Sequence, residues 1–228
     1  MIAIAKARPT LESAPLRGDH GAIDIDAANH ALREATPAEI VTWALSLDKR
    51  AIATTSFGVN AAATLHAVVE QAPSLPVIWV DTGFNLRDTY VQADAVTEQL
   101  GLNLHVYSPL ITAERISAKL GGIPLPEDAD NHRWFTEKVK LEPFRRAIAD
   151  FRPQLWFSGI RAEETDHRRS LDIVSLDHRG IIKVAPFFYW SDSEIDSYML
   201  EHGLVSCQHY FDPTKVSSGR ECGLHTSV

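Results

Sequence analysis

The residues best suited to covalent chemistry lie three positions from the end of the chain, in the segment Arg220-Glu221-Cys222-Gly223-Leu224-His225. The segment is poorly suited to a protein core, because only Leu224 and the thiol of Cys222 are apolar. It therefore indicates a reactive tail. From these residues alone, a partly buried thiol on a frayed chain end is the competing interpretation.

Two short polar segments follow apolar runs typical of buried strands. Ser56-Phe57-Gly58 follows residues 51–55 and precedes an alanine-rich helical pattern through Val69. Backbone N–H groups at such a helix start bind anions. Asp81-Thr82-Gly83 follows residues 76–80, at a strand end where open α/β sheets bind ligands. The first segment lacks the nucleoside-triphosphatase and dinucleotide signatures, so an ordinary strand-to-helix connection is the alternative interpretation.

Cations gather after a further apolar run at residues 155–158, which leads into Gly159-Ile160. The cations are Arg161, His167, Arg168 and Arg169. Guanidinium groups bind phosphate or sulfate in a bidentate manner, so the cluster favours an anionic ligand. The interleaved acids Glu163, Glu164 and Asp166 offer the alternative of internal ion pairs. Lys140 belongs to a further cationic stretch on a predicted helix, for which a solvated helix face is the simpler interpretation.

Strands and helices alternate along most of the chain, which predicts an α/β fold with a mostly parallel, open twisted sheet and helices on both faces. We expect strands at residues 51–55, 76–80, 104–107 and 155–158. We expect helices at about 26–34, 86–100, 112–120 and 133–150, the last with a break at Pro143. Two further helices are expected, one that starts at Thr36 and an alanine-rich one that follows residues 56–60 and runs through Val69. A hairpin at 172–176 and 181–185 precedes a helix from the capping box at Ser191 to about His202.

The predicted organisation is a loose N-terminal arm (1–22), one α/β domain (23–203) and a mobile C-terminal tail (204–228) that carries Cys222. A formal charge of -8 argues against nucleic-acid and membrane partners. No apolar run approaches the roughly 20 residues of a membrane span. With only two cysteines and no secretory signal, we expect a reducing cytoplasm and neither a disulfide framework nor an iron-sulfur cluster.

The ordered set of motifs resembles the assimilatory sulfonucleotide reductases over roughly residues 36 to 225. The motifs are Ser56-Phe57-Gly58, Asp81-Thr82-Gly83, Lys140-Leu141-Glu142-Pro143, Gly159-Ile160-Arg161 with Arg168, and the segment ending in Glu-Cys-Gly-Leu-His. The resemblance implies an adenine nucleotide α-hydrolase-like fold. It also implies reduction of a sulfonucleotide to sulfite with electrons from thioredoxin or glutaredoxin, no tightly bound cofactor, and a homodimer.

The resemblance also implies roles for individual residues. It assigns substrate binding to Ser56, Phe57, Gly58, Asp81, Thr82, Gly83, Lys140, Gly159, Ile160, Arg161, Arg168, Arg220 and His225. Cys222 would attack the sulfur and form an S-sulfonate, which a dithiol carrier would release as sulfite. Nearby cations would lower the pKa of the thiol and reduce the repulsion between thiolate and sulfonate.

The cysteine content helps to decide which sulfonucleotide is the substrate. Relatives with a [4Fe-4S] cluster carry two cysteine pairs, but here Phe135-Thr136 replaces the first pair and only Cys207 stands in the later region. Cluster-free relatives mostly use 3′-phosphoadenylyl sulfate (PAPS), which is the favoured substrate. Adenylyl sulfate (APS) is the alternative, because residues 208–215 depart from the pattern usual in PAPS reductases.

Two further questions stay open at the level of sequence. A nucleotide-binding redox sensor without turnover is the alternative from another functional class, and the intact tail motif argues against it. ATP pyrophosphatase activity is disfavoured, because the loop of those relatives is replaced by residues 56–60. Cys207 is either a resolving cysteine for Cys222 or a packed thiol, and the packed thiol is favoured.

Overall fold

The computed structural model describes residues 23–206 and 209–215, and these form a single mixed sheet flanked by helices. The strands are β1 (Ala51–Thr55), β2 (Pro76–Val80), β3 (Asn103–Tyr107), β4 (Leu155–Phe157), β5 (Val174–Leu176) and β6 (Ile182–Val184). They are ordered β3-β2-β1-β4-β6-β5. Every neighbouring pair is parallel except the hairpin β5–β6. The prediction of a mostly parallel α/β sheet is confirmed.

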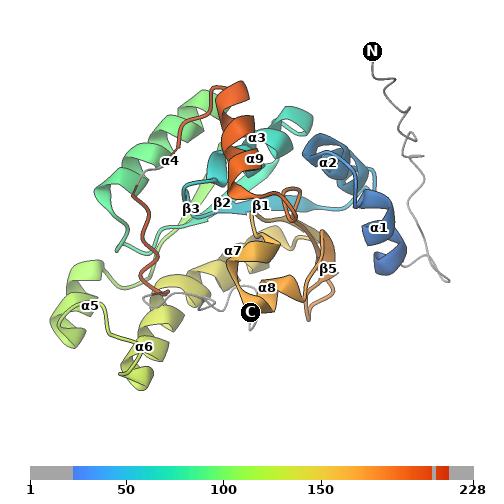
Figure 1. Cartoon of the computed structure of the whole chain (residues 1–228). Helices are drawn as coiled ribbons and strands as arrows, with labels where there is room; N and C mark the ends of the chain where they lie inside the picture. The colour runs from blue at the N-terminus through green and yellow to red at the C-terminus, as the bar shows by residue number, and fades with distance from the viewer. Residues whose placement is uncertain (1–22, 207–208, 216–228) are drawn as a thin grey trace, which may run out of the picture.

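The helices lie on both faces of this sheet. They are α1 (Ile25–Leu32), α2 (Pro37–Leu45), α3 (Ala61–Gln71), α4 (Arg87–Leu100), α5 (Ala113–Leu120), α6 (Ala129–Thr136), α7 (Glu142–Phe151), α8 (Asp166–Arg169) and α9 (Asp192–Glu201). In Figure 1, α3, α4 and α9 lie above the sheet and α7 lies below it. None of the helices in the described ranges is long and apolar enough to span a membrane.

Alternating side chains of the central strands divide the core into two layers. On β2, Val77 and Trp79 belong to the large cluster beneath α2, α3 and α9, whereas Ile78 belongs to the cluster that contains Phe144 of α7. Since successive strand residues face opposite sides, a strand buried on both faces must be apolar at every position. This requirement explains the continuous apolar runs in the sequence.

Two helices begin at the capping boxes that the sequence predicts. At α2, the Glu39 N–H donates to Thr36 Oγ1 (3.3 Å), and the Thr36 N–H donates to the Glu39 carboxylate (2.7 Å). At α9, Ser191 and Glu194 repeat both bonds at 3.4 and 2.8 Å. These bonds satisfy N–H groups that lack an intrahelical partner, and they fix the residue at which each helix starts.

The predicted helix over residues 133–150 consists of α6, a π-helical turn η2 (Glu137–Leu141) and α7. The Glu142 N–H donates to the Glu137 carbonyl, five residues back. Pro143 explains the widened turn, because a proline ring lacks an N–H and clashes with the carbonyl four residues earlier in a regular helix. Lys140 lies in this turn and is buried.

The chain that follows α9 packs along α4. The side-chain amide of Gln99 donates to the carbonyl of Gly203 (2.7 Å), and that of Gln92 donates to the carbonyl of Val205 (2.8 Å). The predicted mobile tail (204–228) begins in this stretch, and its mobility stays a prediction. Side-chain amides on α4 satisfy two carbonyls at the start of this irregular chain.

A buried histidine joins α3 to α9. His66 Nδ1 lies 2.8 Å from the Tyr198 hydroxyl, and Nε2 lies 3.5 Å from the Glu70 carboxylate. The His66 ring stacks on that of His202 with centroids 4.4 Å apart. Burial lowers the pKa of His66 below the ordinary value of 6.5; Glu70 opposes this shift, and His202 adds to it. The folded protein therefore favours neutral His66.

This histidine should make the stability of the fold fall in mild acid. Because its pKa is lower in the folded than in the unfolded protein, the unfolded state binds more protons below pH 6.5. The free energy of unfolding should be highest above that pH and decline as the pH falls. In His66→Gln the decline should be shallower, as measured by urea unfolding from pH 7.5 to 5. His105→Gln, on edge strand β3, is the control, and an unchanged slope in His66→Gln would contradict the assignment.

Candidate active site

A cavity of about 660 Å³ opens at the carboxyl ends of β1, β2 and β4. Strand order reverses at β1, which pairs with β2 on one side and β4 on the other. Such a reversal is where open α/β sheets bind ligands, and this volume suits a nucleotide-sized ligand. Of the predicted substrate-binding residues, the cavity is lined by Ser56, Gly58, Thr82, Lys140, Gly159, Ile160, Arg161 and Arg168.

The N-terminus of α3 faces this cavity. Asn60, Ala61 and Thr64 line it, and the first turn of α3 carries no acidic residue and no side-chain cap. The N–H groups and the positive end of the helix dipole therefore point toward the cavity, which favours an anionic ligand. In the loop before α3, a Cβ at Gly58 would lie in ordinary van der Waals contact with the Tyr210 ring, at 3.5 Å.

Phe57 is buried beneath the loop and does not line the cavity. Its backbone is left-handed, with φ of 48°, a conformation that costs free energy for a bulky residue. The Phe57 ring packs edge-on against Trp79 with centroids 5.1 Å apart, and its N–H donates to Thr55 Oγ1 (2.9 Å). These contacts hold the strained turn in place, so the predicted contribution of Phe57 to binding can come only through its backbone.

Asp81 organises the next loop from outside the cavity. Its Oδ1 accepts hydrogen bonds from the Gly83 N–H (2.9 Å), the Asn85 amide (2.9 Å) and the Tyr90 hydroxyl (2.8 Å). Burial, together with this carboxylate, raises the pKa of Tyr90 to about 12. Gly83 adopts φ of 77°, which favours glycine. Of the predicted Asp81-Thr82-Gly83 set, the cavity lining includes only Thr82.

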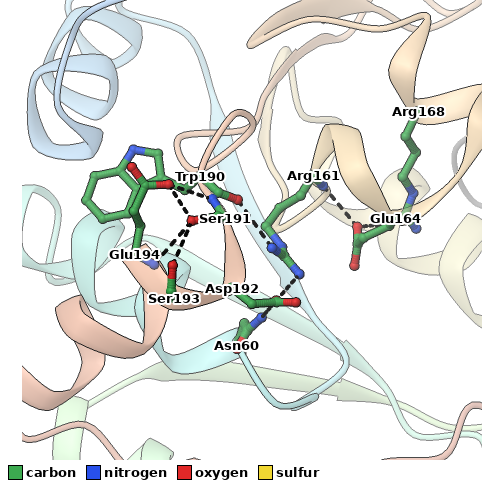
Figure 2. Close-up of polar contacts among 9 residues, drawn as sticks. All are labelled: Asn60, Arg161, Glu164, Arg168, Trp190, Ser191, Asp192, Ser193 and Glu194. Carbon is green, nitrogen blue, oxygen red and sulfur yellow. Dashed lines mark hydrogen bonds and ion pairs between the residues drawn. The ribbon is translucent and has the colours of Figure 1, made fainter.

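Two of the predicted arginines are held by carboxylates, as Figure 2 shows. Arg161 Nη2 lies 2.6 Å from Asp192 Oδ1, which also accepts from Asn60 at 3.3 Å. Arg168 pairs with Glu164, whose carboxylate also accepts from the Arg161 N–H at 2.9 Å. The predicted alternative of internal pairing therefore holds for Arg168 and Glu164, while both guanidinium groups still line the cavity.

Lys140 reaches the cavity from the other face of the sheet. Its Nζ lies 2.5 Å from Asp212 Oδ2 and 3.3 Å from Thr214 Oγ1. The solvated helix face considered for this lysine is wrong, because only 7% of Lys140 is exposed. Burial alone would raise the pKa of Asp212, but the charge of Lys140 and the hydrogen bonds from Lys140 and Thr214 hold it below the ordinary value of 3.8. The Asp212 carboxylate is therefore ionised at neutral pH.

Several polar residues of the cavity were missed at the level of sequence, among them Ser158, Asp212 and Lys215. Ser158 ends the predicted strand 155–158, lines the cavity, and has a buried Oγ without a hydrogen-bond partner among the described residues. Its position was the available signal, since a small polar residue at the carboxyl end of a buried strand faces the ligand site. Asp212 and Lys215 also line the cavity, and no local pattern distinguishes them from other loop residues.

The predicted nucleophile Cys222 and its neighbours Arg220 and His225 lie outside the described residues, as does Cys207. Within residues 23–206 and 209–215, no three His, Cys, Asp or Glu side chains are grouped to hold a metal ion. The described part of the site offers a helix N-terminus and buried cations, an arrangement suited to binding an anionic ligand.

Comparisons with a family model and with known proteins agree on one family. Residues 50–213 match the phosphoadenosine phosphosulfate reductase domain. The phosphoadenosine 5′-phosphosulfate reductase of Synechocystis sp. is 33% identical over 86% of this chain and 79% of its own length. That of Salmonella arizonae is 35% identical over 77% and 72%.

A solved structure shares the fold. The phosphate complex of phosphoadenylyl-sulfate reductase from Candida auris matches with a TM-score of 0.68 and 24% identity, over 81% of this chain and 88% of that one. The domain match spans most of the chain, and the sequence relatives exceed 30% identity over most of their own lengths. The chain therefore belongs to the phosphoadenosine phosphosulfate reductase family, as the motifs of its sequence predicted.

Proposed function

We propose that this protein reduces 3′-phosphoadenylyl sulfate to sulfite and adenosine 3′,5′-bisphosphate in sulfate assimilation. The observation that carries the proposal is the cavity at the sheet switch point, where a helix N-terminus meets the buried cations Lys140, Arg161 and Arg168 in a chain of this family. A sulfonucleotide carries several negative charges, and this cavity supplies fixed positive ones.

The chemistry assigned to Cys222 follows from the substrate. The Cys222 thiolate attacks the sulfur of the sulfonate, an S–S bond forms, and the S–O bond to the phosphate breaks, so the nucleotide leaves with the electron pair. Cations near the sulfonate reduce the repulsion between it and the thiolate. The product on the enzyme is a Cys222 S-sulfonate, and Arg220 and His225 belong to the same tail segment.

The two electrons come from a dithiol carrier, thioredoxin or glutaredoxin. One carrier thiolate attacks Cys222 and displaces sulfite, and the second carrier thiol then resolves the mixed disulfide, which leaves the carrier oxidised. This route requires no tightly bound redox cofactor. It also requires a compartment that keeps thiols reduced, so cytoplasmic localisation is part of the proposal, as is the homodimer that the family resemblance suggests.

A cluster-free APS reductase is the second candidate. Each of the three buried cavity cations pairs with a carboxylate, Asp212, Asp192 or Glu164, so these three cations offer little spare positive charge for an added 3′-phosphate. Single-turnover competition between PAPS and APS decides between the two substrates. If the protein consumes APS preferentially, APS is the substrate in place of PAPS, and the chemistry proposed for Cys222 is unchanged.

Cys222→Ser should abolish sulfite release with PAPS and thioredoxin, because a serine hydroxyl cannot form the S-sulfonate. Nucleotide binding should persist, since the described cavity is built by other residues. Cys207→Ser is the matched control and should keep turnover near the wild-type rate. Mass spectrometry of the wild type mixed with PAPS should find the adduct on Cys222. Full turnover by Cys222→Ser would refute the nucleophile, and tight binding without an adduct would support the redox sensor.

Ser158→Ala should weaken binding of adenosine 3′,5′-bisphosphate without destabilising the fold. The buried hydroxyl has no partner among the described residues, so its removal should leave the melting temperature unchanged or higher. If the bound nucleotide forms a hydrogen bond with this hydroxyl, the binding free energy should be about 1 kcal/mol weaker in the variant. Calorimetric titration measures the affinity, with exposed Ser197→Ala as control. A destabilised variant with unchanged affinity would show that Ser158 serves the fold instead.

A further inference from the structure

The carboxylate of Asp212 lies where an anionic ligand of Lys140 would bind. Asp212 Oδ2 is 2.5 Å from Lys140 Nζ, both residues line the cavity, and their side chains are only 7% and 9% exposed. A buried ammonium group without an anion is unfavourable, so a cation prepared for an anionic ligand needs another partner while that ligand is absent. Asp212 meets this need from within the chain.

Asp212 differs from the other two carboxylates in how it is anchored. Asp192 is the first residue of α9 and Glu164 ends the short 3₁₀ helix η3 (Ala162–Glu164), so both belong to elements that frame the cavity. Asp212 lies in the 209–215 segment, which contains no helix or strand. Displacement of Asp212 therefore breaks no regular secondary structure, whereas displacement of Asp192 or Glu164 would disturb a helix start or a helical turn.

The two oxygens of the Asp212 carboxylate have different partners. Oδ1 accepts from the Thr214 N–H (3.0 Å) and from its hydroxyl (2.6 Å), while Oδ2 accepts from Lys140. The Lys215 N–H donates to the Asp212 carbonyl at 3.0 Å. Lys140 Nζ also donates to Thr214 Oγ1 at 3.3 Å, so the exchange breaks two contacts of this turn with Lys140. The hydrogen bonds within residues 212–215 do not involve Lys140 and can persist after the exchange.

We propose that Asp212 is a stand-in anion that an incoming anionic group of the nucleotide displaces from Lys140, and that it thereby sets the affinity of the cavity for anions. A sulfonate or phosphate offers more oxygens than a carboxylate, and a phosphate monoester offers more charge as well. The identity of the nucleotide rests on the proposed function, whereas the exchange of anions on Lys140 does not. Residues 212–215 then move away from Lys140, while the hydrogen bonds within this turn persist.

Calorimetric titration with inorganic sulfate at low ionic strength tests the exchange. Asp212→Asn should bind sulfate about tenfold more tightly than the wild type, because sulfate no longer has to displace a carboxylate from Lys140. Asp196→Asn removes a carboxylate from the same cavity lining, and Asp196 has no hydrogen bond or ion pair within the described ranges. It should change the affinity less than about twofold. Adding Lys140→Met should cancel the gain of Asp212→Asn.

Sulfate binding in Asp212→Asn that equals or falls below that of the wild type would overturn the proposal, and so would an equal gain in Asp196→Asn. Thermal melting checks that the variants are folded, and Asp212→Ala, with the same expected gain, replaces Asp212→Asn if that variant does not fold. PAPS turnover by the wild type is measured in parallel. If the wild type turns over PAPS but Asp212→Asn does not bind sulfate more tightly, the role proposed for Asp212 is wrong and the proposed function stands. If Asp212→Asn binds sulfate more tightly but the wild type does not turn over PAPS, the role of Asp212 stands and the proposed function is wrong.

Discussion

Burial of positive charge in the cavity wall is the constraint on which the site depends. Lys140, Arg161 and Arg168 are between 5% and 8% exposed. An uncompensated ion at such a position costs several kcal/mol, even after local relaxation. Each of the three pairs with a carboxylate of the cavity wall. A cavity built for anions thus contains anions of its own.

Two of these pairs, Lys140 with Asp212 and Arg161 with Asp192, join elements that are far apart along the chain. Arg161 follows β4 and reaches Asp192 at the start of α9, and Asn60 at the start of α3 donates to the same carboxylate. The contact between α3 and α9 through His66 and Tyr198 fixes the relative position of these helices from the other side. The helix N-terminus that faces the cavity is therefore positioned partly by packing at a distance from it.

Local patterns explain which features the sequence could predict. Strands β1 and β2 have the predicted bounds because their apolar runs satisfy both faces of a covered sheet. The caps at Thr36 and Ser191 depend on residues three positions apart. Lys140 and Asp212 are 72 residues apart, and the chain offers 30 acidic residues as candidate partners, so only the tertiary fold selects this pair. The same holds for Phe57, whose ring is buried by its packing against Trp79.

The three ion pairs share one chemistry but differ in what their exchange would cost the fold. Asp192 lies in the first turn of α9, where the helix dipole favours a carboxylate, and it also binds Asn60. Loss of this pair would loosen both helix starts. Asp212 lies in an irregular turn within residues 209–215, which contain no helix or strand. The same electrostatic need for a partner can thus be met by a fixed carboxylate at the sheet end and by an exchangeable one beside Lys140, because backbone context decides which carboxylate can leave.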